Sequence, residues 1–259
     1  MPKILIVLGG TSSIAKLVVP ELGFDNSKIY YVNRLSKNNQ LNLNSKKKYT
    51  TLIDFGDLQV LEKTLKKFLK QFENEPVVVI NFLGNFGLVE SLSRLDVSTA
   101  LETNKQNLSP FLLIAKLAKN LCSASIVISF SGAGVGGPNL DDSSLGYLAA
   151  KASMSILVEP LDQQLAAHNV RFGLVSPGAF WSPMQKIVAA ANTQDIPKPR
   201  INRAKQLKNK ASSPDKLISL LKFLIENPEE LGGRTWSANF DSVESKNLRV
   251  DFGKMRRLY

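Results

Sequence analysis

A tyrosine and a lysine four residues apart are the pair in this sequence best suited to acid–base chemistry. They are Tyr147 and Lys151, and Ser131 stands sixteen positions before the tyrosine. A spacing of four places both side chains on one face of a helix, where the ammonium favours the phenolate and lowers the tyrosine pKa from about 10. Such a phenol can give or take a proton at a carbonyl or alcohol oxygen. A serine hydroxyl at the end of the preceding strand can hold that oxygen, so the three residues predict a proton-transfer site.

The beginning of the chain has the pattern of a nucleotide-binding strand, turn and helix. Residues 4–8 are a continuous apolar run, typical of a strand buried on both faces of a parallel sheet. Gly9 and Gly10 follow at once, and an apolar-periodic stretch comes after them. Glycines let a backbone approach a phosphate, and the N–H groups at the start of a helix attract the anion. Ser13 and Ala15 stand where the usual three-glycine pattern has its second and third glycines.

Apolar runs and helical stripes alternate along the chain. We expect strands at 4–8, 28–33, 50–54, 76–83, 124–130, 170–175 and 234–238, and helices at 13–22, 57–73, 96–121, 146–167 and 213–226. This alternation predicts an α/β protein: a single-domain Rossmann fold over residues 1–259, with a doubly wound parallel sheet of about seven strands and helices on both faces. Pro160 is expected to kink the helix that contains it or to end it early. Residues 35–49 show no helical stripe, which predicts an irregular connection.

Length, charge and cysteine content limit the classes of protein that fit. The chain has 259 residues, 44% of them apolar, and a net charge of +11 from 33 basic and 22 acidic residues. No apolar run is long enough for a membrane span or a secretory signal, so we expect a cytoplasmic protein. The single cysteine, Cys122, excludes an internal disulfide and fits a reducing compartment. Without a cluster of metal ligands or a nucleic-acid-binding motif, neither a metal nor a nucleic acid is expected as a partner.

Taken together, these motifs resemble the short-chain dehydrogenase/reductase family over nearly the whole chain. The matching segments, in the family's order, are the glycine turn at 9–15, Asp54-Phe55, Asn81-Phe82-Leu83-Gly84, the Ser131, Tyr147 and Lys151 set, Pro177-Gly178 and Ser182. The third segment departs at two positions from the family's Asn-Asn-Ala-Gly turn. The resemblance implies an oxidoreductase that moves a hydride between a nicotinamide cofactor and a carbonyl or secondary alcohol. It makes Tyr147 the general acid or base, Lys151 the residue that lowers its pKa and binds the nicotinamide ribose, and Ser131 the residue that orients the substrate oxygen.

The resemblance also implies a set of cofactor-binding residues. They are Gly9, Thr11, Ser12, Ser13, Ile14, Asn33, Arg34, Asp54, Phe55, Asn81, Phe82, Gly84, Tyr147, Lys151, Pro177, Gly178 and Ser182. An acid at the end of the second strand would favour NAD, but Asn33-Arg34 stands there, and Arg34 can grip a 2′-phosphate. We therefore expect NADP(H), with NAD as the alternative if Arg34 only stacks on the adenine.

A helix asparagine completes the family's catalytic set, and the sequence offers two candidates for it. Thr103-Asn104 resembles the family's approach to that asparagine, and Asn107 lies one turn further on. Pro110 leaves the Gln106 carbonyl without its helical donor, where a proton-relay water could bind. We choose Asn104, with Asn107 as the alternative.

The segment 185–212 corresponds to the family's substrate lid, and its charge bears on the substrate. It carries seven cations, namely Lys186, Lys198, Arg200, Arg203, Lys205, Lys208 and Lys210. A cationic lid favours an anionic small molecule, such as a phosphorylated sugar or a nucleotide sugar.

The sequence leaves two alternative functions open. They are an NAD-linked dehydrogenase of a neutral alcohol and a cofactor-binding regulatory protein with vestigial activity. The resemblance further implies a homodimer or homotetramer.

Overall fold

One parallel sheet organises the molecule, in a computed structural model that describes residues 2–34, 50–53, 57–132 and 144–241. Within these ranges the sheet has seven strands in the order β3-β2-β1-β4-β5-β6-β7. The strands are β1 (Ile4–Leu8), β2 (Ile29–Arg34), β3 (Thr50–Ile53), β4 (Val77–Asn81), β5 (Ile126–Phe130), β6 (Arg171–Ser176) and β7 (Thr235–Ser237). The predicted doubly wound sheet is therefore confirmed. The strand order reverses between β1 and β4, and in such sheets ligands bind at the carboxyl ends of the strands beside that point.

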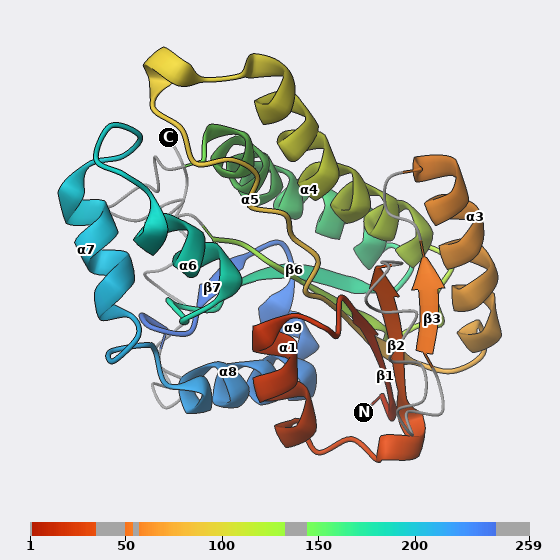
Figure 1. Ribbon diagram of the computed structural model, residues 1–259. Helices are drawn as coiled ribbons and strands as arrows, with labels where there is room; N and C mark the ends of the chain where they lie inside the picture. Colours follow the sequence, from red (N-terminus) through yellow and green to blue (C-terminus); the bar gives the residue numbers. More distant parts are fainter. Residues whose placement is uncertain (1, 35–49, 54–56, 133–143, 242–259) are drawn as a thin grey trace.

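Helices cover both faces of the sheet (Figure 1). On one face lie α3 (Leu58–Leu69), α4 (Val97–Ala118) and α5 (Leu145–Ala166), and on the other lie α1 (Ser13–Val18) and α8 (Pro214–Glu226). The remaining helical segments are η1 (Val19–Glu21), η2 (Asn26–Lys28), η3 (Lys70–Phe72), η4 (Leu92–Arg94), α6 (Pro183–Ala190), α7 (Lys198–Gln206) and α9 (Pro228–Leu231). In the ranges that the structure describes, no helix combines the length and the apolar character needed to cross a membrane.

The unbroken apolar run of β1 is explained by the two cores that it separates. Successive side chains of a strand point to opposite faces. Ile4, Ile6 and Leu8 accordingly belong to the core under α3, α4 and α5, whereas Leu5 and Val7 belong to the core under α1 and α8. All of β1 is buried, so a polar residue at any of its positions would lose water without a new partner.

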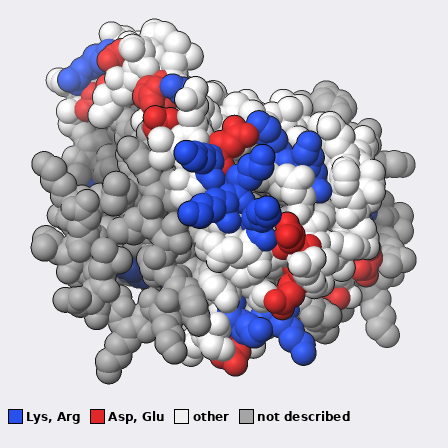
Figure 2. Space-filling model, turned by 90° about the vertical axis from the view of Figure 1, so that its right-hand side faces the viewer, with Lys and Arg blue, Asp and Glu red and all other residues white. Residues whose placement is uncertain are grey.

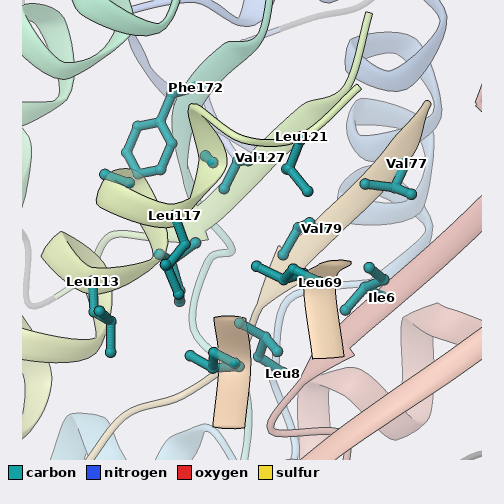
Figure 3. Packing of buried hydrophobic residues seen from close by; sticks show 14 of the residues in the cluster. Ile6, Leu8, Leu69, Val77, Val79, Leu113, Leu117, Leu121, Val127 and Phe172 are labelled. Carbon is teal, nitrogen blue, oxygen red and sulfur yellow. The ribbon is translucent and has the colours of Figure 1, made fainter. Parts of the chain in front are cut away.

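The core under α3, α4 and α5 fixes these helices against the centre of the sheet (Figure 3). Leu69 of α3 and Leu117 of α4 pack there with Val79 of β4. The opposite side of α3 carries three exposed lysines, Lys63, Lys66 and Lys67, and the exposed Lys70 follows at the start of η3. The face of the molecule that carries α3 shows a dense group of Lys and Arg side chains beside fewer Asp and Glu (Figure 2).

Two prolines lie inside long helices without ending them. Pro160 belongs to α5, which continues to Ala166, so the expectation of an early helix end is wrong. Pro160 and Ile156 are both exposed, and water can therefore bind the Ile156 carbonyl that loses its helical donor. Pro110 also lies within a helix that continues past it, α4, but it is buried.

Three α-helices in the described ranges were not assigned from the sequence, namely α6, α7 and the four-residue α9. The segment 185–212 that was predicted to be a lid contains α7 and most of α6, which begins two residues before it. The predicted irregular connection at 35–49 lies outside the described residues.

Candidate active site

Ser131, Tyr147 and Lys151 come together at the carboxyl end of β5. Ser131 follows Phe130, the last residue of β5, and the other two are one turn apart on α5. Lys151 Nζ donates a hydrogen bond to the Phe130 carbonyl oxygen at 2.7 Å and lies 5.4 Å from the centroid of the Tyr147 ring. A Cβ placed on Gly132 would lie 3.0 Å from the Tyr147 hydroxyl oxygen, so this hydroxyl lies against the residue next to Ser131. The structure thus brings the three residues to one point.

Burial lowers the pKa of Lys151 but leaves its side chain charged at neutral pH. Lys151 is 3% exposed, and desolvation lowers its pKa from 10.5 to about 8. At neutral pH the ammonium form still predominates, so a positive charge stands beside the phenol. Ser131 is buried as well, and its Oγ lies 3.4 Å from Ser155 Oγ on α5.

An apolar cluster forms one wall of this site. It joins the segment after β4 to α6 and α7, and its buried members are Phe86, Val188, Ile196, Ile201 and Ala204. Met184 and Tyr147 pack at its edge. The Phe86 ring meets the Tyr147 ring edge to face, with centroids 5.3 Å apart. Sequence reasoning missed Phe86 and Met184, because no spacing distinguishes them from ordinary core residues.

The turn after β1 requires glycine at two positions. Gly9 has a φ of +77°, and a Cβ there would lie 3.1 Å from the backbone nitrogen of Leu83. A Cβ on Gly10 would lie 2.3 Å from a carbon of the Tyr31 ring. The backbone therefore passes close to both neighbouring strands with no side chain of its own in between.

The predicted phosphate-binding residues continue from this turn into α1. Ser12 is the N-cap of α1, and its side chain accepts a hydrogen bond from the Ala15 N–H at 3.0 Å. Thr11 precedes the cap, and Ser13 and Ile14 begin the helix. All four lie in the segment next to Gly9 and Gly10, as the sequence pattern requires.

Asn33 carries an unsatisfied acceptor at the end of β2. The side chain is 8% exposed, and in the described part of the chain its Oδ1 is the buried side-chain polar atom without a hydrogen-bond partner. A Cβ on Gly10 would lie 3.4 Å from this oxygen, so it adjoins the glycine turn. A buried acceptor is costly unless a ligand donates to it, and a ribose hydroxyl is such a donor. The site therefore fits the adenosine half of a nicotinamide dinucleotide.

Three of the predicted cofactor residues are only partly described or not described. The backbone of Arg34 ends β2, while Asp54 and Phe55 lie outside the described residues.

Asn81 shapes the turn after β4. Its Nδ2 donates to Ser129 Oγ at 3.3 Å, and its Oδ1 accepts from the Leu83 N–H at 3.1 Å. The first bond connects the ends of β4 and β5, and the second closes the turn after β4. Phe82, which replaces an asparagine of the family pattern, stacks on Phe130 with ring centroids 4.7 Å apart.

Asn107 is bonded to the segment that follows this turn. Its Oδ1 accepts from the Asn85 N–H at 3.0 Å, and its Nδ2 donates to the carbonyl oxygens of Asn85 and Thr103, both at 2.7 Å. The side chain is 6% exposed, and a Cβ on Gly84 would lie 3.6 Å from its Oδ1. Asn104, chosen from the sequence, is half-buried one turn earlier on α4. Asn107 is therefore the asparagine that lies beside the turn after β4. The sequence alone did not show which of the two asparagines lies there.

The Pro-Gly turn leads from β6 into α6. Pro177 is buried, and Gly178 has a φ of +90° with Ser212 Oγ only 2.7 Å from the position of a Cβ. Ser182 is the N-cap of α6, and its Oγ accepts from the Gln185 N–H at 3.4 Å.

The cations of α7 do not share one environment. Lys198, Arg203 and Lys205 are exposed, whereas Arg200 is half-buried and donates to Gln185 Oε1 on α6 at 3.4 Å. The exposed lysines of α3 lie at the opposite end of the molecule from α6 and α7 (Figure 1). The net charge of +11 is therefore only partly a property of the lid.

Comparisons with known proteins identify the family and the fold of the chain. The family described as short chain dehydrogenase matches residues 3–193. The KRED1-Pglu enzyme has a similar structure, with a TM-score of 0.73, 18% identity, and coverage of 90% of this chain and 99% of its own. Levodione reductase gives a TM-score of 0.70 at 16% identity and coverage of 91% and 95%.

A third similar structure is the Pseudomonas aeruginosa RhlG/NADP active-site complex, with a TM-score of 0.68, 16% identity, and coverage of 92% and 95%. No curated protein matches the sequence. At these identities the structural neighbours show the fold alone, while the family match spans most of the chain. The chain therefore belongs to the short-chain dehydrogenase family, the oxidoreductases that interconvert alcohols and carbonyl compounds with a nicotinamide cofactor.

Proposed function

We propose that the protein is an NADP(H)-dependent carbonyl reductase or alcohol dehydrogenase that uses Ser131, Tyr147 and Lys151. The observation that carries the proposal is the convergence of these side chains at the end of β5, with the Tyr147 hydroxyl against Gly132. The bound cofactor supplies or accepts the hydride. Everything else in the reaction is a matter of holding the substrate oxygen and moving one proton to or from it.

Tyr147 is the proton donor in reduction and the acceptor in oxidation. The Lys151 ammonium, 5.4 Å from the ring centroid, favours the deprotonated phenol and so eases loss of the proton. The bond from Lys151 to the Phe130 carbonyl fixes that charge in place. The Ser131 hydroxyl donates to the substrate oxygen and sets its distance from Tyr147. Positioned acid–base groups of this kind contribute about 10²–10⁴-fold in rate.

Asn107, and not Asn104, is our candidate for the fourth residue of the set. Two of its hydrogen bonds, both to the backbone of Asn85, hold the segment after β4 against α4, and the third is to Thr103 within α4. Pro110 supports the same assignment, because it leaves the Gln106 carbonyl, next to Asn107, without a helical donor. That carbonyl can hold a proton-relay water.

The cofactor preference that we propose is for NADP(H). Asn33 places a neutral amide where a carboxylate would repel a 2′-phosphate, and the next residue in the sequence, Arg34, is a cation. The unsatisfied Asn33 Oδ1 can accept a hydrogen bond from a ribose hydroxyl. One structural neighbour, from Pseudomonas aeruginosa, was determined as an NADP complex, which supports this preference.

Two substrate classes are candidates, and a different observation supports each of them. The cations of α7, with Arg200 directed to Gln185 of α6, support a phosphorylated sugar or a nucleotide sugar. The apolar wall of Phe86, Met184 and Val188 beside Tyr147 supports a neutral ketone. Two substrates that share a ketone and differ by one phosphate group distinguish the two classes.

Removal of the Tyr147 hydroxyl tests the proposal directly. Tyr147→Phe keeps the ring and its contact with Phe86, so the fold and NADPH binding should be retained. Turnover of an activated ketone such as ethyl benzoylformate, followed by loss of NADPH absorbance, should fall by about 10²–10⁴-fold. Wild-type turnover in Tyr147→Phe would overturn the proposed mechanism.

A further inference from the structure

Ser155 extends the line of functional residues on α5 by one turn. Tyr147, Lys151 and Ser155 are spaced by four residues and lie along one side of the helix. Ser155 Oγ lies 3.4 Å from Ser131 Oγ and 3.1 Å from the carbonyl oxygen of Lys151. Ser155 is half-buried and Ser131 is 4% exposed, so bulk water has little access to the pair. No role for Ser155 follows from the reaction described above.

The Ser155 hydroxyl has one proton and two acceptors within reach. It can donate to the Lys151 carbonyl, which is the usual bond of a helical serine to the residue four positions before it. In that state it can accept a hydrogen bond from Ser131. It can also donate to Ser131 Oγ, because either oxygen of the pair can be the donor. The Lys151 carbonyl loses little by this exchange, since it also accepts the helical N–H of Ser155.

We propose that Ser155 is a positioning residue that donates to Ser131 while Ser131 donates to the substrate oxygen. When the substrate oxygen binds, the Ser131 hydroxyl rotates to donate its hydrogen bond to that oxygen. The Ser155 hydroxyl then rotates as well, so that it donates to Ser131 Oγ and no longer to the Lys151 carbonyl. Hydrogen bonds in such a chain polarise one another, so Ser131 becomes a stronger donor. Ser155 touches neither substrate nor cofactor in this scheme. The proposal rests on the proposed function, because it assigns Ser131 the role of substrate donor.

A pair of variants of the same shape isolates the hydroxyl. Ser155→Thr keeps it, whereas Ser155→Val replaces it with a methyl group of similar size. We expect Ser155→Val to lower kcat for ethyl benzoylformate with NADPH by about 3- to 10-fold, the usual worth of one net hydrogen bond. KM and the Kd of NADPH should not change, and Ser155→Thr should restore kcat. If Ser155 had only a structural role, Ser155→Val would lower Tm and weaken NADPH binding. The two variants would then not differ in kcat alone.

The same change in a Ser131→Ala background tests whether Ser155 acts through Ser131. Without the Ser131 hydroxyl, Ser155→Val should have no further effect on kcat. The proposal is overturned if Ser155→Thr and Ser155→Val have equal kcat, or if the valine costs the same factor in the Ser131→Ala background. Tyr147→Phe distinguishes this failure from a failure of the proposed function. A large loss in Tyr147→Phe with no effect of Ser155→Val would reject the role of Ser155 alone.

Discussion

Lys151 Nζ donates a hydrogen bond to the Phe130 carbonyl oxygen at 2.7 Å, and this bond connects the second turn of α5 to the end of β5. Ser131 follows Phe130 directly, so the same bond sets Ser131 opposite Tyr147. The cost of this arrangement is a buried ammonium group. Lys151 is 3% exposed, and its pKa is lowered from 10.5 to about 8.

We predict that Lys151→Met stabilises the folded protein at pH 7. The unfolded chain holds the lysine proton more tightly than the folded chain does, so burial opposes folding at neutral pH by on the order of 3 kcal/mol. Loss of the bond to the Phe130 carbonyl offsets about 1 kcal/mol of the gain. Denaturant unfolding should therefore show a net increase of roughly 1–2 kcal/mol in the free energy of unfolding at pH 7, together with loss of turnover.

The pH dependence of this gain provides its control. Between the folded pKa of about 8 and the unfolded value of 10.5, the unfolded state binds more protons, so the Lys151 contribution to wild-type stability rises with pH. The advantage of Lys151→Met should accordingly shrink when both proteins are unfolded at pH 10. An advantage of the same size at both pH values, or none at pH 7, would show that buried charge is not the cause.

The strands could be predicted because each is an apolar run in a sheet that is covered on both faces. The helix predicted at 146–167 agrees with α5, and only the expectation of an early end at Pro160 is wrong. That expectation failed because the exposure of Pro160 and Ile156 cannot be read from the sequence. The lid helices were missed for a different reason. Their few buried residues, such as Val188 and Ile201, pack on each other and on Phe86, so the stripe that reveals a helix against the main core is short.

In the candidate site, residues related by spacing within one helix could be predicted, whereas those that depend on a contact between distant segments could not. Tyr147 and Lys151 were found because their contact depends on a spacing within one helix. The choice between Asn104 and Asn107 depends on a contact with Asn85, which is 22 positions before Asn107. Both asparagines lie on α4, and only the tertiary structure determines which one reaches that segment.

We predict that Asn107→Ala loses both stability and turnover, while Asn104→Ala behaves like the wild type. The Asn107 side chain makes three hydrogen bonds in a buried position, and its removal leaves the Asn85 N–H and carbonyl unpaired. A loss of about 1–3 kcal/mol in the free energy of unfolding should result. Turnover with NADPH should fall as the segment after β4 loosens. If Asn104→Ala is the more damaging substitution, our assignment of the fourth residue is wrong.

We predict that Arg200 determines the response to substrate charge, if the substrate is an anion. Fructose 6-phosphate and fructose provide a matched pair, because they share the ketone and differ by the phosphate. Arg200→Gln should raise KM for fructose 6-phosphate by about 10-fold or more, because the charge-assisted bond to its phosphate is lost. KM for fructose should not change. The exposed Lys205→Gln is the control for a general effect of charge. Equal effects on both sugars, or preference for neutral ketones in the wild type, would favour the apolar substrate class.

We predict that the cofactor preference can be reversed at the end of β2. The wild type should bind NADPH more tightly than NADH, because neither Asn33 nor Arg34 repels a 2′-phosphate. Asn33→Asp introduces a carboxylate beside Gly10, at the position of the unsatisfied Oδ1, which can accept from a ribose hydroxyl but repels the phosphate. It should weaken NADPH binding by about 1–3 kcal/mol and leave NADH binding unchanged or improved. Arg34→Asp should weaken NADPH binding by a similar amount. Fluorescence titration of both cofactors measures these affinities without any substrate, and equal affinity of the wild type for NADH and NADPH would contradict the preference.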